Sequence, residues 1–443
     1  MKVLGALFLA LSAATPASSV FVIVPDVLAQ AGSGALIAMG LAALIAICVA
    51  QAYAELGSAF PLAGGEYSMT SRTLGPLAGF VVLGLNLVNS LLAAAVLALG
   101  IGQYLGAQAL GISPVATAVG AVACATLLGV LNIRTNAFVT GVFVAVEIVA
   151  LLILSVLGFG HVHHALPALI AHPATLNAGA LTPTPAASIG LAVAVAIFAY
   201  DGYGSAVYFG EELHEAPRQI GRAIVWALGI TVAAEIIPIT AVLMGAPDLR
   251  ALLGSSAVFP DFIRQTGGPL LARVLGLGVA LAIFNAVIAT VLLTSRQLYS
   301  TGRDRTWPAA VDDLFTRLHP SFQSPWAATL VAGALAAGLC LVDLKLLLIA
   351  TGTGTAIIYG AMCLAVLAGR RSGATRHGHH RMPLVPWLAL LTLAALAGVL
   401  WSDWIDPEEG RPGLLIAAAV ALAFGGYYLV VLKRRGWPAA PET

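Results

Sequence analysis

Residues 196–212 read AIFAYDGYGSAVYFGEE, and this stretch decides how the rest of the chain is interpreted. It begins within an apolar run long enough to enter a lipid bilayer, yet its middle holds Asp201, Gly202 and Gly204. A continuous helix facing lipid disfavours both the carboxylate and the glycines. An interruption inside a membrane leaves backbone groups unpaired, which is tolerated only beside protein or a wet cavity. The stretch therefore predicts an interrupted membrane helix at a binding site.

The composition indicates an integral membrane protein. Hydrophobic residues make up 60% of the 443 residues and charged residues 9%, and the mean hydropathy is +0.96. Such a chain cannot cover a soluble globule with polar side chains. The net charge of +1 gives no sign of nucleic-acid binding, and none is expected. The four cysteines lie in apolar runs without ligand-like spacing, so they are predicted to be core side chains.

Twelve apolar stretches are long enough to span a bilayer, and breakers or charges separate them. The first, residues 3–31, resembles a signal peptide at its start, but the apolar pattern resumes at Val20, which favours one spanning helix interrupted near Pro16. The predicted fold class is thus an all-α polytopic membrane protein. The stretches are 3–31, 34–58, 76–106, 114–132, 136–160, 185–210, 219–246, 269–298, 325–342, 346–368, 383–401 and 412–432.

The distribution of basic residues predicts the orientation. An even number of spans puts both termini on one side, and cytoplasmic segments are enriched in Lys and Arg. With a cytoplasmic N-terminus, sixteen of the 21 basic residues fall on the inner side. The outer five are Arg250, Arg264, Arg273, Lys345 and Arg411. We expect a multi-pass protein of the cell membrane, the inner membrane in a prokaryote, with both termini cytoplasmic.

The first and sixth stretches both carry small, polar or helix-breaking residues at their centres. Thr15 to Ser19 interrupt the first stretch, and Asp201 to Ser205 interrupt the sixth. Matching interruptions five helices apart indicate an inverted repeat of five plus five helices, with both helices unwound at the bilayer midplane. The expected units are residues 1–160, residues 161–370 with an external loop 161–184, and two further helices with the C-terminus in 371–443.

Helix polarity assigns charge preferences to the two interruptions. Backbone N–H groups near Ser18 and Ser19 start a new half-helix, whose positive end suits a carboxylate. Carbonyl groups near Phe198 and Ala199 end a half-helix and suit an ammonium group. Together they suit a zwitterionic amino acid. The alternative is a proline kink in one helix and a small-residue packing face in the other.

Three separated motifs make the chain similar to a known family. Residues 52–67 read AYAELGSAFPLAGGEY and precede Leu74-Gly75-Pro76, residues 198–202 read FAYDG, and residues 295–308 read SRQLYSTGRDRTWP. They resemble the amino acid–polyamine–organocation permeases, which share the leucine-transporter fold. The likeness covers about residues 5–370, and it implies a secondary transporter that works by alternating access, in which the first, second, sixth and seventh helices rock against the rest.

The resemblance also implies individual residue roles. The family's Gly-Ser-Gly in the first helix corresponds to Ala17-Ser18-Ser19, whose amides are expected to hold a substrate carboxylate, although both glycines are replaced. The family's aromatic gate falls on Phe198. Ala199 and Tyr200 align with positions whose carbonyls receive the amino group, and Gly202 aligns with the glycine of the unwound turn.

Glu147 is the sharpest departure from the family. Many proton-coupled members carry a lysine at the middle of the fifth helix, and the alignment of residues 141–149, GVFVAVEIV, puts Glu147 at that position. A carboxylate inside a bilayer is costly, so it faces the protein interior and is a functional candidate by default. We expect Glu147 to exchange protons during transport, or to contact a substrate amine; a neutral structural acid is the alternative.

Other intramembrane polar and aromatic residues have two interpretations each. Asp201 either caps the second half-helix or contacts substrate, and Glu235 either lines the pocket or is structural. Asp26 is interpreted as an acid in outer vestibule water. Glu55 and Glu66 are expected to pair with basic residues such as Arg72 or Arg296. Possible pocket aromatics, for which core packing is the alternative, are Tyr104, Tyr203, Tyr208 and Phe284.

The sequence thus predicts a proton-coupled amino acid symporter without a bound cofactor or metal. Sodium is the alternative driving ion, since Asn285, Thr290 and Thr294 offer a weak oxygen site. An amine, polyamine or cationic amino acid permease or exchanger is the nearest alternative, and a receptor or channel the distant one. No nucleophile–base or metal pattern favours an enzyme. A short helix around residues 259–263 is expected to act as a lid. The expected partners are a small-molecule substrate and the lipid bilayer. The sequence does not indicate which oligomeric state the protein has.

Overall fold

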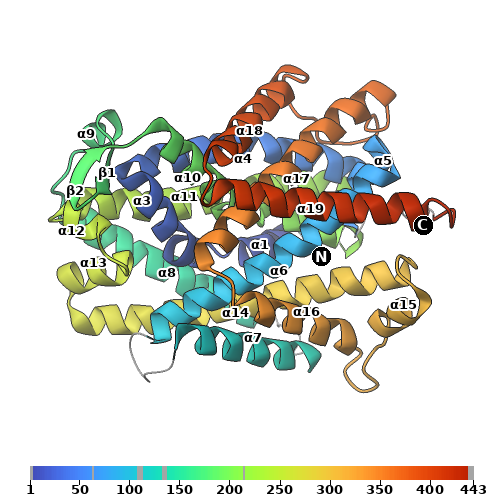
Figure 1. The fold of residues 1–443 in the computed structure, drawn as a ribbon, viewed down its shortest axis with the longest axis horizontal. Coiled ribbons are helices and arrows are strands. Elements are labelled where there is room, and N and C mark those ends of the chain that lie inside the picture. The colour runs from blue at the N-terminus through green and yellow to red at the C-terminus, as the bar shows by residue number, and fades with distance from the viewer. Residues whose placement is uncertain (1–2, 62–63, 107–112, 132–136, 213–214, 438–443) are drawn as a thin grey trace.

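The computed structural model describes residues 3–61, 64–106, 113–131, 137–212 and 215–437. Over these residues the protein is an elongated, nearly all-helical bundle, and most of its long helices run along its length (Figure 1). In this part of the chain nine helical stretches are long and apolar enough to cross a membrane, and two shorter apolar helices accompany them. The protein therefore has the multi-pass helical architecture that its composition predicts.

The long helices are apolar around most of their circumference, because one face meets lipid and the other meets neighbouring helices. Polar residues instead mark their ends. The side chain of Asp343 accepts hydrogen bonds from two backbone N–H groups at the start of α17, as N-cap residues do. The bounds are α4 (Ala35–Ala59), α6 (Pro76–Gly106), α7 (Pro114–Val130), α8 (Ala137–Gly160), α11 (Ala216–Gly245), α14 (Pro269–Arg303), α16 (Trp326–Leu339), α17 (Leu344–Ser372), α18 (Trp387–Ile405), α19 (Gly410–Tyr427) and the π-helical turn η4 (Tyr428–Leu432).

The first apolar stretch is divided into short helices. Pro16 lacks an N–H group and its ring restricts the residue before it, and Thr15 accordingly leaves the right-handed helical region, with φ of 40°. The chain then passes through a π-helical turn before it regains α-helical geometry. The pieces are α1 (Val3–Ala14), α2 (Pro16–Ser18), η1 (Ser19–Ile23), α3 (Val24–Ala31) and the 3₁₀ turn η2 (Gly32–Gly34).

The sixth stretch is interrupted after α10 (Ala186–Ala199), and a 3₁₀ helix, η3 (Tyr203–Glu212), follows. Gly202 has φ of 109°, which glycine adopts without a steric cost. A β-carbon at Gly202 would also lie 2.6 Å from the Cα of Ala14. The two interruptions therefore touch, and only glycine meets both demands at this point.

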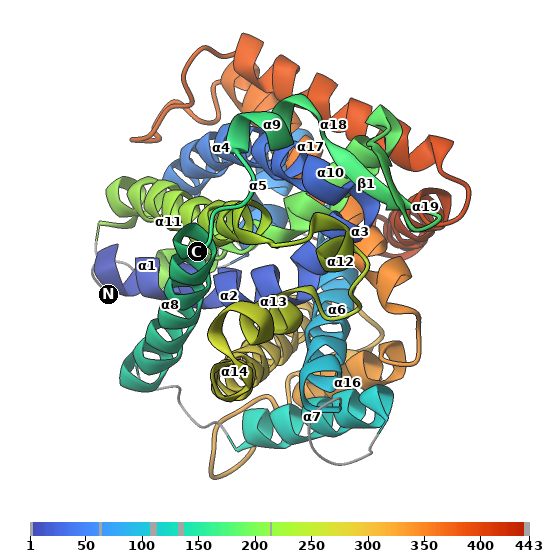
Figure 2. The same cartoon turned by 90° about the vertical axis from the view of Figure 1, so that its left-hand side faces the viewer.

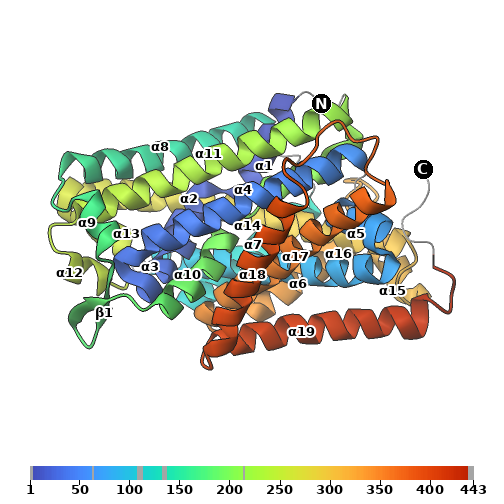
Figure 3. The ribbon, with the colours of Figure 1, turned by 90° about the horizontal axis from the view of Figure 1, so that it is seen from above.

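The connecting segments divide between the two ends of the bundle. One end, seen in Figures 1 and 3, carries α9 (Leu166–Ala171), β1 (Ala174–Asn177), β2 (Ala180–Pro183), α12 (Leu249–Leu253) and α13 (Val258–Gly267). α5 (Gly65–Leu74) and α15 (Ala309–Phe315) lie toward the other end, in the half that holds both termini. The segments predicted to be outer are thus grouped apart from those predicted to be inner.

A small hairpin is the exception to the predicted all-α fold. β1 (Ala174–Asn177) pairs antiparallel with β2 (Ala180–Pro183) in the predicted external loop. Ala178 and Gly179 join them with φ of 47° and 78°. Two consecutive residues with positive φ match the tight turn whose twist suits a hairpin. This turn lacks the Asn-Gly or Asp-Gly pair from which a hairpin is usually predicted.

The interrupted first stretch runs through the interior of the bundle. Viewed from the end that carries α9 and α12, α2 lies near the middle (Figure 2). It contacts α8, α11 and α14, and α10 packs against α3, α4 and α17. Both interruptions are therefore enclosed by other helices, which can supply partners for their free backbone groups.

Candidate functional site

A cavity of about 120 Å³ lies between the two interruptions. Its volume exceeds the roughly 10–15 Å³ that one water needs, so it has room for a small polar ligand or several waters. The interruption at residues 13–15 forms one side and residues 201–205 form another, with α6, α14 and α17 completing the wall. Its polar lining residues are Thr15, Ser19, Glu66, Asn86, Asn89, Ser90, Asp201, Ser205, Tyr208, Thr290 and Thr351.

Four of the predicted substrate-binding residues line this cavity: Ser19, Phe198, Asp201 and Gly202. The Ser19 hydroxyl donates to the carbonyl of Ala199 over 2.8 Å, so a side chain from one interruption satisfies a backbone group of the other. The remaining predicted residues, Ala17, Ser18, Ala199 and Tyr200, are buried next to the cavity but not among its lining residues.

The polar face of α6 was not predicted from the sequence. Asn86, Asn89 and Ser90 all line the cavity. Their spacing of three and four residues puts them on one face of a helix, a signal that was available in the third apolar stretch. The amide of Asn89 donates to the carbonyl of Thr351 over 3.1 Å and to the hydroxyl of Thr355 over 3.0 Å, which ties α6 to α17.

Glu66 reaches the cavity from α5. The sequence predicted an arginine partner for it, but among the described residues its carboxylate forms no ion pair with an arginine. The Tyr208 hydroxyl donates to its carboxylate, and the amide of Asn86 donates to the same oxygen over 3.0 Å. Burial raises the pKa of Glu66, and the bond from Tyr208 opposes that shift. The pairing differs because α5 turns Glu66 inward, where only neutral partners are available among the described residues.

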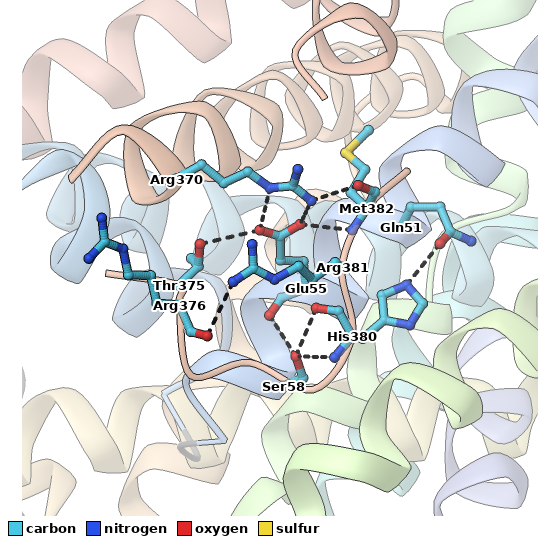
Figure 4. A network of polar contacts seen from close by, with 9 residues as sticks. All are labelled: Gln51, Glu55, Ser58, Arg370, Thr375, Arg376, His380, Arg381 and Met382. Atoms are coloured by element: carbon cyan, nitrogen blue, oxygen red, sulfur yellow. Dashed lines mark hydrogen bonds and ion pairs between the residues drawn. The ribbon is translucent and has the colours of Figure 1, made fainter. Parts of the chain in front are cut away.

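Glu55, at the end of α4, has the arginine partner but not the one expected (Figure 4). Arg370 of α17 donates to both of its oxygens, over 2.9 Å and 2.6 Å. The Thr375 hydroxyl and the backbone N–H of Met382 add bonds of 3.2 Å and 2.8 Å. The sequence did not reveal this pair because the partner lies 315 residues away. The loop after α17 is thereby fixed to the end of α4.

Glu147 lies on α8 behind the first interruption, with 1% of its surface exposed. One carboxylate oxygen accepts a hydrogen bond from the backbone N–H of Ala17 over 3.4 Å. The other oxygen has no hydrogen-bond partner in the described part of the chain. Glu147 therefore contacts the backbone N–H of Ala17, one of the amides that were predicted to bind a substrate carboxylate.

Glu235 is fully buried on α11, and within the described residues neither of its oxygens forms a hydrogen bond of ordinary geometry. Its polar neighbours include Ser19 and Tyr200, both beside the interruptions. It does not line the cavity. A fully buried carboxylate without a cation is costly when ionised, so this position favours the neutral acid.

Asp201 and Asp26 occupy different surroundings. Asp201 lines the cavity and accepts a hydrogen bond of 3.1 Å from the Tyr359 hydroxyl. Asp26 accepts one of 2.7 Å from the amide of Gln30. It lines a separate hollow of about 250 Å³ together with Lys345 and three acids.

Two of the four predicted pocket aromatics, Tyr203 and Phe284, are not among the residues that line the cavity. The ring of Tyr203 lies 5.9 Å from that of Tyr53 and 6.0 Å from that of Tyr359, and it does not line the cavity. Phe284 is partly buried against the core. Tyr208 does line the cavity. The side chain of Tyr104 lies outside the part of the structure that is described.

Comparison with known proteins gives a match over nearly the whole chain. A family model described as amino acid permease matches residues 1–426. A transporter of Mycobacterium tuberculosis, itself uncharacterized, is 30% identical over 396 residues, 88% of this chain and 83% of that protein. The methylthioribose transporter of Bacillus subtilis is 24% identical over 416 residues, 88% and 86% of the two chains. The branched-chain amino acid permease of Lactococcus lactis is 27% identical over 440 residues, 94% and 93% of the two chains.

Proposed function

Because the chain belongs to the amino acid permease family, we propose that it carries amino acids through the membrane by alternating access and couples this transport to protons. It is a multi-pass membrane transporter and not an enzyme. The substrate and the driving ion are the proposed parts, and they rest on the cavity between the two interruptions and on Glu147.

The proposed transport fold has twelve spans in a five-plus-five inverted repeat, followed by two helices. Of the nine candidate spans in the described part of the chain, the stretch Ala10–Ala59 covers two of the proposed spans, the interrupted first stretch and α4, and the shorter helices α7 and α16 supply two more. The contact between Gly202 and Ala14 supports a substrate site where the two repeats meet.

We expect the substrate to lie in the cavity with its charged groups toward the two interruptions. The half-helix that begins after Thr15 presents backbone N–H groups, which favour a carboxylate. The carbonyl end of α10 and the nearby Asp201 favour an ammonium group. Phe198 supplies an apolar wall. The small volume favours a small neutral amino acid.

The single observation that carries proton coupling is the contact of Glu147 with the first interruption. Its carboxylate accepts from the Ala17 N–H, and its second oxygen is unpaired among the described residues. An ionised Glu147 holds this amide and repels a nearby substrate carboxylate. A proton taken up by Glu147 removes this repulsion and weakens the hydrogen bond to the amide, so that substrate and proton bind together.

Proteoliposomes test both parts of this proposal. Radiolabelled alanine should accumulate when an inward proton gradient is imposed at equal sodium concentrations, and a proton ionophore should abolish the accumulation. Accumulation that follows a sodium gradient and ignores the pH gradient would refute proton coupling. In that case Thr290 and Thr294, whose hydroxyl groups are possible sodium ligands, are the residues to substitute next.

An amine or cationic substrate is the second candidate, and a specific observation favours it. Glu66 and Asp201 both line the cavity, and no basic side chain does among the described residues. An ammonium-bearing ligand without a carboxylate would complement that wall. Competition of putrescine, arginine and alanine against a bound labelled substrate separates the two cases, because only the amine candidate predicts that putrescine displaces it.

The short helix α13 is the proposed outer lid. Phe259 at its start is fully buried, and its ring lies 5.5 Å from that of Phe21 in η1, at the first interruption. A movement of the interrupted helix would therefore be transmitted to α13. Phe198 and α13 would together close the path to the cavity as the bundle rocks.

A further inference from the structure

A large hollow lies apart from the central cavity, where the ends of α14 and η4 come together. Its volume is about 750 Å³, within the range of small-molecule sites. The tail that follows η4 is held against the turn after α14, because the Trp437 indole donates to the carbonyl of Asp304 over 2.8 Å. The hollow is therefore built by two chain segments that are far apart in sequence.

The floor of the hollow is aromatic. Trp307 and Trp437 line it, and the ring of Phe80 lies 6.4 Å from the first and 5.8 Å from the second. Phe424 packs edge-on against Trp307 at 6.1 Å. Tryptophans gather at the membrane–water interface, and both helices that end here are candidate membrane spans.

The rim carries three arginines from different segments: Arg303, Arg305 and Arg435. The Arg303 and Arg305 side chains are 59% and 67% exposed, and each pairs with one exposed or partly exposed aspartate. Arg435 donates to a backbone carbonyl, that of Trp307. Exposed ion pairs of this kind are weak, so a stronger anionic ligand can replace them.

Two acids also line the hollow, but both are engaged within the protein. Asp304 accepts from Arg303, and Asp312 accepts from the backbone N–H of Trp307 over 3.0 Å. Three arginines and two aspartates leave the lining one positive charge in excess, and Lys433 follows η4 directly. This end of the bundle is also the side that the basic residues predict to be cytoplasmic.

We propose that this hollow is a binding site for the phosphate group of an anionic ligand. Arginine forks match phosphate oxygens, and the aromatic floor covers the less polar part of the ligand. Basic pockets beside spanning helices at the cytoplasmic surface bind the headgroups of anionic lipids, so a phospholipid is one source of that phosphate and a soluble phosphate compound is the other. The site is separate from the cavity and does not depend on the proposed substrate.

The test measures the thermal unfolding midpoint of the full chain, purified in an uncharged detergent and titrated with phosphatidylglycerol, phosphatidylcholine or inorganic phosphate. Phosphatidylglycerol should raise the midpoint, and phosphatidylcholine should not. Arg303→Gln/Arg435→Gln should lose the increase, since each arginine is expected to contribute on the order of five-fold in binding. The matched control Arg317→Gln/Arg434→Gln removes two exposed charges nearby and should keep it.

The outcomes separate the sources and decide the proposal. A shift with inorganic phosphate but not with phosphatidylglycerol, lost in the first double variant alone, supports the site with a soluble ligand. No shift with either probe overturns it, as does an equal loss in both double variants, or an equal shift with phosphatidylcholine. If the first double variant does not fold, Arg435→Gln alone must still weaken binding, measured by native mass spectrometry of bound lipid.

Discussion

Glu55 and Glu147 are both nearly inaccessible carboxylates on long helices, with exposed fractions of 0% and 1%, but their surroundings differ. Glu55 accepts hydrogen bonds from both arms of a guanidinium, from a hydroxyl and from a backbone N–H. Glu147 accepts a single long one from the Ala17 N–H. Glu235, fully buried, has none of ordinary geometry among the described residues.

The difference shows what each carboxylate can do. A buried charge with a cation and several donors stays ionised and fixes the segments that surround it. A buried carboxylate without a cation favours the neutral form, so that its charge can change when a proton or a ligand arrives. We therefore propose that Glu55 holds one end of the bundle together and that Glu147 couples transport to protons. The predictions below test this division.

Removal of the Glu55 partner should have the largest effect. Arg370→Met leaves a carboxylate at 0% exposure without its cation, and the loss of one partner of a buried pair costs about 3–5 kcal/mol. We expect a clear fall in the thermal unfolding midpoint of the purified protein. Arg371→Met, one residue along and exposed, should leave the midpoint almost unchanged.

The double variant Glu55→Met/Arg370→Met sharpens this result. It removes the charge together with its partner, so it should recover most of the stability that Arg370→Met loses. If the double variant is as unstable as the single one, the role of the pair is not electrostatic and the comparison with Glu147 fails.

Substitution at Glu147 should abolish coupling and leave the fold intact. Glu147→Gln keeps the shape of the side chain and cannot exchange a proton. We expect proton-driven accumulation of substrate to disappear from proteoliposomes, while exchange of labelled for unlabelled substrate continues. The unfolding midpoint should stay near that of the wild type, in contrast to Arg370→Met. Proton-driven uptake that persists in this variant would remove Glu147 from the mechanism.

Replacement by methionine should affect stability differently at Glu235 and at Glu55. Glu235→Met replaces a fully buried group whose oxygens are unpaired among the described residues, and an unsatisfied buried polar group costs about 1–3 kcal/mol. Stability should be unchanged or higher in Glu235→Met. Glu55→Met leaves Arg370 and two further donors without their acceptor, so stability should fall. Equal losses measured by thermal unfolding would contradict the assignment of Glu235 as an unpaired acid.

The sequence predicted the elements better than it predicted their partners. The interruptions at Thr15 and Gly202 were visible because proline, glycine and polar residues are conspicuous in apolar runs. The contact of Ser19 with Ala199 and the pair of Glu55 with Arg370 were not, since both join residues far apart in the chain. Local pattern carries no information about which distant side chains meet, and a single sequence offers no covariation to supply it.

Some residues that line the cavity could be predicted from the sequence, and others could not. The polar face of α6 follows helical spacing and was open to prediction. The inward position of Glu66 on α5 was not, because its partners Asn86 and Tyr208 lie 20 and 142 residues away in the chain. The substrate site and the role of Glu147 are predictions, and the variants at Glu55, Arg370 and Glu147 test them.

The smallest expected effect lies at the rim of the Glu55 network. The ring of His380 contacts the side chain of Gln51 over 2.9 Å, and burial lowers the pKa of His380, with Glu55 opposing that shift. A lowered pKa in the folded state stabilises the fold fully above the ordinary value of about 6.5, and this contribution is lost as the pH falls below it. The unfolding midpoint should therefore fall on acidification, and His380→Gln should reduce that fall slightly. His379→Gln, at an exposed neighbour, is the control. If both variants reduce the fall in the midpoint equally, the ring of His380 does not cause this pH dependence.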